Sequence, residues 1–168
     1  EAAYADRALI GEAQRADLAP GDRAKAHRLV FGAVQRRRTL DWFVDPDITN
    51  PAAVEPQVRD VLRIGAYELV YSDGVPASAA VDQAVRLRRE IPGDARRQKA
   101  RAGVVNAVLR RLAASVDTRR ASLGTATAEG AAVAESVPDW IARRLFEDIG
   151  PDAARSTLRA ANEPAESV

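Results

Sequence analysis

Apolar residues recur at intervals of three and four along almost the whole chain, and no stretch alternates as a β-strand does. This spacing is typical of amphipathic helices that bury one face. Prolines and glycines separate the helical stretches. The pattern therefore predicts an all-α protein. The expected helices span about residues 2–17, 23–43, 54–71, 79–90 and 95–114, followed by one that begins at Pro138 and a short last one that ends near Asn162.

The apolar spacing weakens after residue 115. Residues 121–136 are mostly small, with few large apolar side chains, which is the composition of a linker or a loosely packed connection. Trp42 and Trp140 both have apolar neighbours at helical spacing, so we expect each to anchor a core. We therefore expect a helical bundle of about five core helices over residues 1–115, a linker over 116–136, and a two-helix connector over 137–168.

Composition excludes several kinds of catalytic site. The chain contains no cysteine and a single histidine, His27. Disulfides, thiolate metal sites and a cysteine nucleophile are therefore excluded, and one histidine without partners does not make a zinc site. No glycine-rich turn follows a strand and no Gly-x-Ser-x-Gly elbow is present, so we predict neither a nucleotide-cofactor cradle nor a serine nucleophile. We predict no catalytic residue, metal site or cofactor site in this chain.

Charge is distributed unevenly. The formal net charge is +1, but residues 86–111 hold nine basic and two acidic residues and therefore carry +7. A basic stripe on an otherwise acidic body is typical of polyanion binding. A solvated helix face explains the same charges equally well. The candidate residues for binding a nucleic acid are Arg86, Arg88, Arg89, Arg96, Arg97, Lys99, Arg101, Arg110 and Arg111.

Membrane contact is not expected. No apolar run approaches the length of a membrane span, and no charged-then-apolar leader is visible. The sequence therefore favours a soluble, cytoplasmic protein.

Four segments resemble the NusB-like domain, in the same order and spacing. Together they cover about residues 6–112, and the family fold that they imply is an all-α bundle. The segments are residues 22–42, with Gly32 and Asp41; residues 62–69, with Gly65 and Tyr67; residues 75–81, with Pro76; and residues 103–111, with Asn106.

Within this family, the chain resembles the methyltransferase branch more than it resembles the stand-alone antitermination factors. Arg110, and a tail over residues 137–164, resemble the N-terminal part of the RsmB (Sun) family of rRNA cytosine methyltransferases. This resemblance implies a non-catalytic domain that binds small-subunit ribosomal RNA and docks on a catalytic domain. That catalytic domain would follow Val168 and would hold S-adenosylmethionine and the cysteine nucleophile. The alternatives are a stand-alone NusB-type transcription antitermination factor, which binds RNA and a protein partner, and a purely structural domain that orients the catalytic part.

The family motifs also carry structural expectations. Gly32 and Gly65 are expected at close helix crossings. Asn106 lies among valines and alanine, so we expect a buried, hydrogen-bonded amide. Asp41 is expected to pair with Arg110. None of these residues is predicted to be catalytic.

Overall fold

The chain folds into helices and connecting turns. The structure, a computed structural model, describes residues 5–162, with side chains described from Arg7 onward. No strand occurs in that range, so the predicted all-α class is confirmed. The predicted start of the first helix at Ala2 lies outside the described residues. The elements are α1 (Ala5–Arg15), α2 (Pro20–Gln35), α3 (Arg37–Val44), η1 (Asp45–Asp47), η2 (Pro51–Ala53), α4 (Pro56–Tyr71), α5 (Ala77–Leu87), η3 (Arg88–Glu90), α6 (Ala95–Ser122), α7 (Ala128–Ala134), α8 (Asp139–Ile149) and α9 (Pro151–Ala160).

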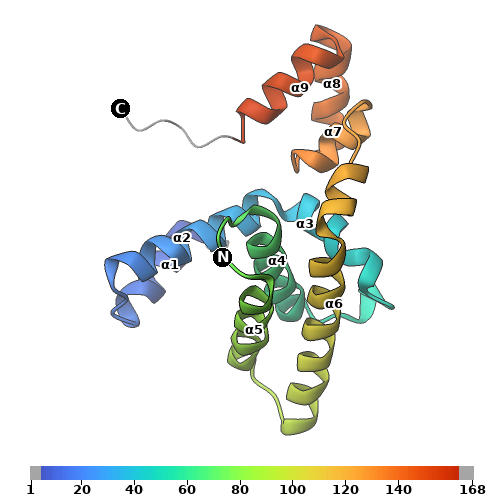
Figure 1. Cartoon of the computed structure of the whole chain (residues 1–168). Helices are drawn as coiled ribbons and strands as arrows, with labels where there is room; N and C mark the ends of the chain where they lie inside the picture. The colour runs from blue at the N-terminus through green and yellow to red at the C-terminus, as the bar shows by residue number, and fades with distance from the viewer. Residues whose placement is uncertain (1–4, 163–168) are drawn as a thin grey trace.

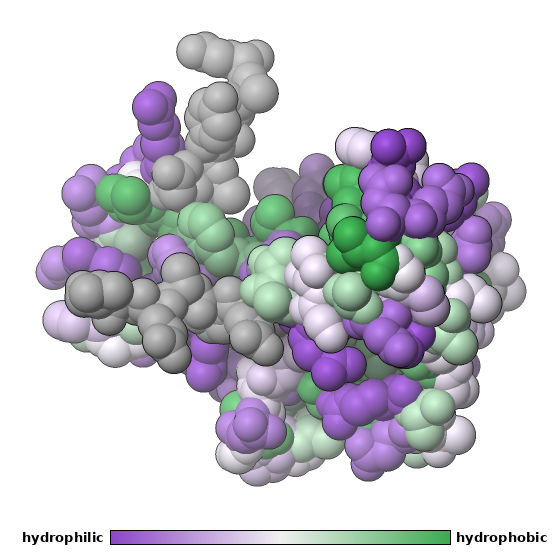
Figure 2. All heavy atoms as spheres, turned by 90° about the horizontal axis from the view of Figure 1, so that it is seen from above, coloured by the Kyte–Doolittle hydropathy of each residue, from purple (hydrophilic) through white to green (hydrophobic). Residues whose placement is uncertain are grey.

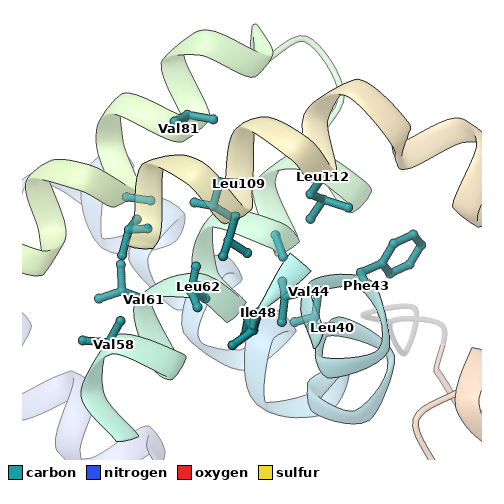
Figure 3. Close-up of a cluster of buried hydrophobic side chains, with 14 of the residues drawn as sticks. Leu40, Phe43, Val44, Ile48, Val58, Val61, Leu62, Val81, Leu109 and Leu112 are labelled. Atoms are coloured by element: carbon teal, nitrogen blue, oxygen red, sulfur yellow. The ribbon is translucent and has the colours of Figure 1, made fainter. Parts of the chain in front are cut away.

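One large hydrophobic core lies between α2, α3, α4, α5 and α6. In Figure 1, α4, α5 and α6 run side by side, while α1 and α2 project to one side of them. The i, i+3, i+4 spacing along α4 places Val61, Leu62 and Ala66 inside, as predicted. Burying a leucine or phenylalanine of this kind stabilises the fold by about 1.5–3 kcal/mol. Figure 3 shows α3, α4 and α6 meeting through their largest fully buried side chains, which are Phe43, Leu40, Leu62, Leu109 and Leu112.

The predicted long second helix is two helices. The backbone leaves helical geometry at Arg36, where φ is −95° and ψ is 16°, and α3 begins at the next residue. Apolar spacing gives no sign of the break, because Ala33 and Leu40 are both buried and seven residues apart. Tertiary contacts stabilise it instead. The guanidinium of Arg36 lies 5.3 Å from the centre of the Tyr71 ring and 3.0 Å from Glu135 Oε2.

Two helical glycines lie at close helix crossings, as predicted. A methyl group on Gly32 would come within 2.1 Å of the Tyr67 ring. At Gly65 it would meet Leu109 Cδ1 at 2.5 Å and Ala84 Cβ at 3.0 Å, so α5 and α6 both approach α4 there. Each glycine lowers helix propensity by about 1 kcal/mol relative to alanine. Close packing of α4 against its neighbours offsets that cost.

The stretch predicted as a loose linker is largely helical. α6 extends to Ser122, and α7 occupies residues 128–134 with Thr127 as its N-cap. Ala131 and Ala132 of α7 are buried with Ala142 and Leu158, forming a second, smaller core. The C-terminal unit therefore contains three described helices, α7, α8 and α9, where two were expected. α7 was not predicted because it buries alanines, and small side chains do not produce a visible pattern of large apolar residues at helical spacing.

Trp140 does not anchor a core, contrary to the prediction. Its side chain is 69% exposed, while Ile141, Leu145 and Phe146 pack against the second core. Seen from above, the molecule presents hydrophilic and hydrophobic residues intermixed, without one broad apolar face (Figure 2). Trp42 does pack against the main core, with its ring 5.1 Å from that of Phe43.

α6 runs from the bottom of the molecule in Figure 1 up to the C-terminal helices α7–α9. Its N-cap is Asp94, which accepts a hydrogen bond from the backbone N–H of Arg97 at 2.8 Å. The helix contains 28 residues. Neither it nor any other described helix is apolar enough over a sufficient length to cross a membrane.

Candidate nucleic-acid interface

Four of the predicted basic residues form an exposed group where α5 turns into α6. They lie at the end of the molecule opposite α7–α9, beside the turn formed by η3 (Figure 1). Each side chain is exposed, and none makes a hydrogen bond or ion pair with a described residue. Their charge is therefore fully available to a polyanion. We call this group the basic tip; it consists of Arg86, Arg89, Arg96 and Lys99.

Arg101, predicted as a candidate nucleic-acid contact, does not belong to the basic tip, because its side chain is buried and paired. The residue is 6% exposed. Its guanidinium donates to both carboxylate oxygens of Glu55, at 3.1 and 2.6 Å, and to the backbone carbonyls of Ile91 and Pro92, both at 3.0 Å. Hydrogen bonding to Arg101 lowers the pKa of Glu55, and the same contact raises the pKa of Arg101. Arg101 fastens the turn before α6 to the segment before α4.

Two further basic residues near the tip already have partners. Arg88 is half-buried and donates to Gln98, whose own amide donates to the carbonyl of Ile91 at 2.6 Å. Arg97 is exposed and lies 4.0 Å from Asp94, a distance at which a solvated ion pair contributes little. Arg88 therefore helps to stabilise the turn before α6, while Arg97 remains accessible at the edge of the tip.

Arg110 and Arg111 lie farther along α6. Arg110 is 14 residues beyond Arg96, which corresponds to about 21 Å along the helix axis. Both are exposed; Arg111 donates to the carbonyl of Asp47 at 3.1 Å. The nine predicted residues thus separate into groups. Four form the basic tip, with Arg97 at its edge. Arg88 and Arg101 each stabilise the turn before α6, and Arg110 and Arg111 lie far from the tip.

Two expectations about motif residues are wrong. Asn106 is only half-buried, and its Oδ1 accepts from Arg110 Nε on the exposed side of α6 at 2.9 Å. Asp41 pairs with Arg63 and Arg59, not with Arg110; Arg63 Nη2 lies 2.8 Å from Asp41 Oδ2. The pairing with Asp41 raises the pKa of Arg63 although burial opposes it. Flanking apolar residues do not reveal which side of a helix faces the core when the helix is contacted on several sides.

The run Arg36-Arg37-Arg38 joins the two cores. Arg38 donates to the carbonyl of Val137 at 2.7 Å and to Asp139 Oδ1 at 2.6 Å. The buried Thr39 hydroxyl donates to the carbonyl of Val133 at 2.7 Å. Arg37 is exposed, without a hydrogen bond or ion pair to described residues. The run therefore acts mainly as a clamp between α3 and the C-terminal helices.

A buried carboxylate near the basic tip was not among the predicted site residues. Glu68 is 3% exposed although it lies on α4 between apolar neighbours. Lys25 Nζ lies 3.5 Å from its Oε1. Glu68 lies within the family motif at residues 62–69, and this was the one feature of the sequence that could have drawn attention to it.

Pro76, the proline of the third family motif, is the N-cap residue of α5 and directs that helix back along α4.

The fold and its site define an all-α bundle with a free cationic tip and with a second small core at the C-terminal end of α6. Residues 1–114 match the NusB family. The chain belongs to this family.

The relatives bear two kinds of name. A probable ribosomal RNA small subunit methyltransferase B from Synechocystis sp. is 34% identical over 165 residues, which cover 94% of this chain and 34% of the relative. The ribosomal RNA small subunit methyltransferase B of Thermus thermophilus is 36% identical over 148 residues, covering 86% of this chain and 31% of the relative. A transcription antitermination protein NusB from Ralstonia nicotianae is 34% identical over 96 residues, covering 56% of this chain and 59% of the relative. The chain spans about a third of the length of the methyltransferases that it matches.

Proposed function

We propose that this chain is the RNA-binding, non-catalytic domain of an S-adenosylmethionine-dependent rRNA (cytosine-C5) methyltransferase. The observation that carries the RNA-binding part is the basic tip, whose four cations are exposed and without partners among the described residues. Phosphate contacts by such residues supply most of the sequence-independent affinity for nucleic acids. Membership of the NusB family supports RNA as the polyanion.

The methyltransferase assignment rests on how far the relatives match. The methyltransferase of Synechocystis sp. matches 94% of this chain, whereas the Ralstonia antitermination protein matches 56%. The longer match takes in α7–α9 as well as the main bundle. We therefore favour the methyltransferase over the antitermination factor. Small-subunit ribosomal RNA and a catalytic domain are the partners that this proposal implies.

The cofactor would be held elsewhere. The described residues are helices and turns, and they contain no strand followed by a glycine-rich turn and a helix, the unit that cradles nucleotide cofactors. The residues present therefore do not fit S-adenosylmethionine. In this proposal the catalytic domain holds the cofactor, and this chain binds and orients RNA.

Charge reversal tests the RNA-binding proposal. Replacing Arg86, Arg89, Arg96 and Lys99 with glutamate should weaken binding of small-subunit rRNA segments broadly, since phosphate contacts position RNA without specifying its sequence. Each lost contact should reduce the log–log salt slope by about 0.7–0.9. Arg28→Glu with Arg159→Glu is a control with half of this charge change, to be compared with Arg96→Glu with Lys99→Glu, because both arginines are exposed and unpartnered among the described residues but lie outside the tip. Unchanged affinity in the tip variant would show that the tip is not the RNA surface.

A further inference from the structure

A cleft of about 410 Å³ lies beside the basic tip, between α2, α4 and α5. Its walls include the apolar side chains of Leu29, Ile64 and Leu87. Glu68, which is 3% exposed, and the exposed Arg86 of the basic tip both line the cleft. Clefts of roughly 300–1,000 Å³ with apolar walls and a few polar groups are typical small-molecule sites.

The carboxylate in this cleft lacks a hydrogen bond. Glu68 Oε1 is fully buried beside Lys25, and neither oxygen of the carboxylate accepts a hydrogen bond from the described residues. Lys25 Nζ forms an ion pair with Glu68 Oε1 at 3.5 Å and also donates a hydrogen bond to Gln83 Oε1 at 2.9 Å. Buried polar atoms are almost always hydrogen-bonded, and leaving one unsatisfied is costly. The cleft therefore offers a strong acceptor to a donor group that enters it.

Charge indicates what kind of molecule enters. A carboxylate in the lining selects an N–H donor, and the apolar walls suit a flat ring. Arg86 in the same lining, with the rest of the basic tip nearby, disfavours a cationic side chain from a protein and favours a molecule that carries phosphate. Glu90, also on the cleft, adds a second acceptor. A nucleotide unites a donor-bearing ring with a phosphate.

We infer that this cleft receives one unpaired, amino-bearing base of the bound RNA, with Glu68 accepting a hydrogen bond from the base and Arg86 contacting its phosphate. The inference rests on the proposed function, since it requires that RNA binds at the basic tip. Single-stranded RNA is recognised by bases turned outward onto side chains in this manner. Carboxylates are established acceptors for the exocyclic amine of cytosine. Uracil has a carbonyl oxygen at the same ring position, which would face the carboxylate unfavourably.

Cytosine and uracil provide a matched comparison, because the two rings are alike in size and differ chiefly at this position. Affinities of the whole chain for short single-stranded oligocytidylate and oligouridylate, measured by fluorescence anisotropy at one salt concentration, should differ by about fivefold in favour of cytidine, the worth of one hydrogen bond. Glu68→Gln should reduce the ratio to about one, because an amide can donate to uracil as well as accept from cytosine. The salt dependence of both affinities should stay as in the unchanged protein.

A second variant keeps the test independent of Glu68. Leu87→Trp fills the cleft without removing any charge and should abolish the cytidine preference, while Leu87→Met should preserve it. Equal affinities for the two oligonucleotides in the unchanged chain, or a preference that survives both Glu68→Gln and Leu87→Trp, would overturn the inference alone. If neither oligonucleotide nor ribosomal RNA binds at all, the proposed function itself fails.

Discussion

Arg96 and Arg101 stand five residues apart on α6 and look alike in the sequence, yet their surroundings are opposite. Arg96 is exposed and unpartnered among the described residues, whereas Arg101 is 6% exposed and bonded to Glu55 and two carbonyls. Arginine suits such a site because its fork of donors can satisfy several acceptors at once. We therefore expect Arg96 to contribute to RNA binding and Arg101 to contribute to the stability of the fold.

Replacing Arg101 with methionine should destabilise the fold. It leaves Glu55 and the carbonyls of Ile91 and Pro92 without their donor, and removing a donor from buried acceptors is costly. We expect Tm to fall by roughly 5–10 °C in a thermal melt followed by circular dichroism. Arg96→Met, the control on the same helix, should change Tm by no more than about 2 °C. Loss of RNA affinity in Arg101→Met at unchanged Tm would contradict this assignment.

Single residues show what sequence patterns could and could not establish. Gly32 and Gly65 were predictable as close approaches, because a glycine inside an apolar helical face has few other uses. Asn106, Asp41 and Arg101 were not. The partners of Asp41 and Arg101 come from other segments of the chain, and the partial exposure of Asn106 depends on which helices cover α6. Periodicity along one helix carries no information about such neighbours.

At the scale of elements, hydrophobic spacing predicted α4 well and α7 poorly. α4 buries large side chains at regular intervals, so its face and length are visible in the sequence. α7 buries two alanines, and small residues leave almost no pattern. The break between α2 and α3 was also invisible, because it depends on contacts of Arg36 with Tyr71 and Glu135, residues remote in the chain.

The clamp by Arg38 gives a prediction at this scale. Arg38→Ala removes the donors to Val137 and Asp139 and should loosen α7–α9 without disturbing the main core. Amide hydrogen exchange should accelerate about tenfold in α7–α9 and stay unchanged in α4. Arg37→Ala is the neighbouring control, since Arg37 makes no such contact with described residues. Equal acceleration in α4 would mean that the two cores open together.

At the scale of the whole molecule, the two cores differ greatly in size. The main core includes buried side chains from five helices, many of them large, whereas the buried residues of the second are Ala131, Ala132, Ala142 and Leu158. So few apolar groups do not offset the entropy of ordering three helices. The second core therefore depends on the first for its stability, through α6 and the Arg36–Arg38 clamp.

Truncation tests this dependence. Residues 1–122 alone should remain helical and unfold cooperatively, because every residue of the main core is retained. A peptide of residues 123–168 should show little helix by circular dichroism, since it loses both its clamp and the end of α6. An unfolded 1–122 protein would show that the two cores form one inseparable unit.

α6 holds the basic tip and the second core at a fixed separation. Its 28 residues correspond to about 42 Å of continuous helix. The helix is also fastened along its length, since Arg119 and Arg120 near its far end donate to the carbonyls of Phe43 and Val70. It therefore fixes both the distance between its two ends and their rotation relative to each other about the helix axis. Because each residue turns a helix by about 100°, a one-residue change in α6 beyond the tip would leave the tip intact but aim everything attached past Ser122 in a new direction.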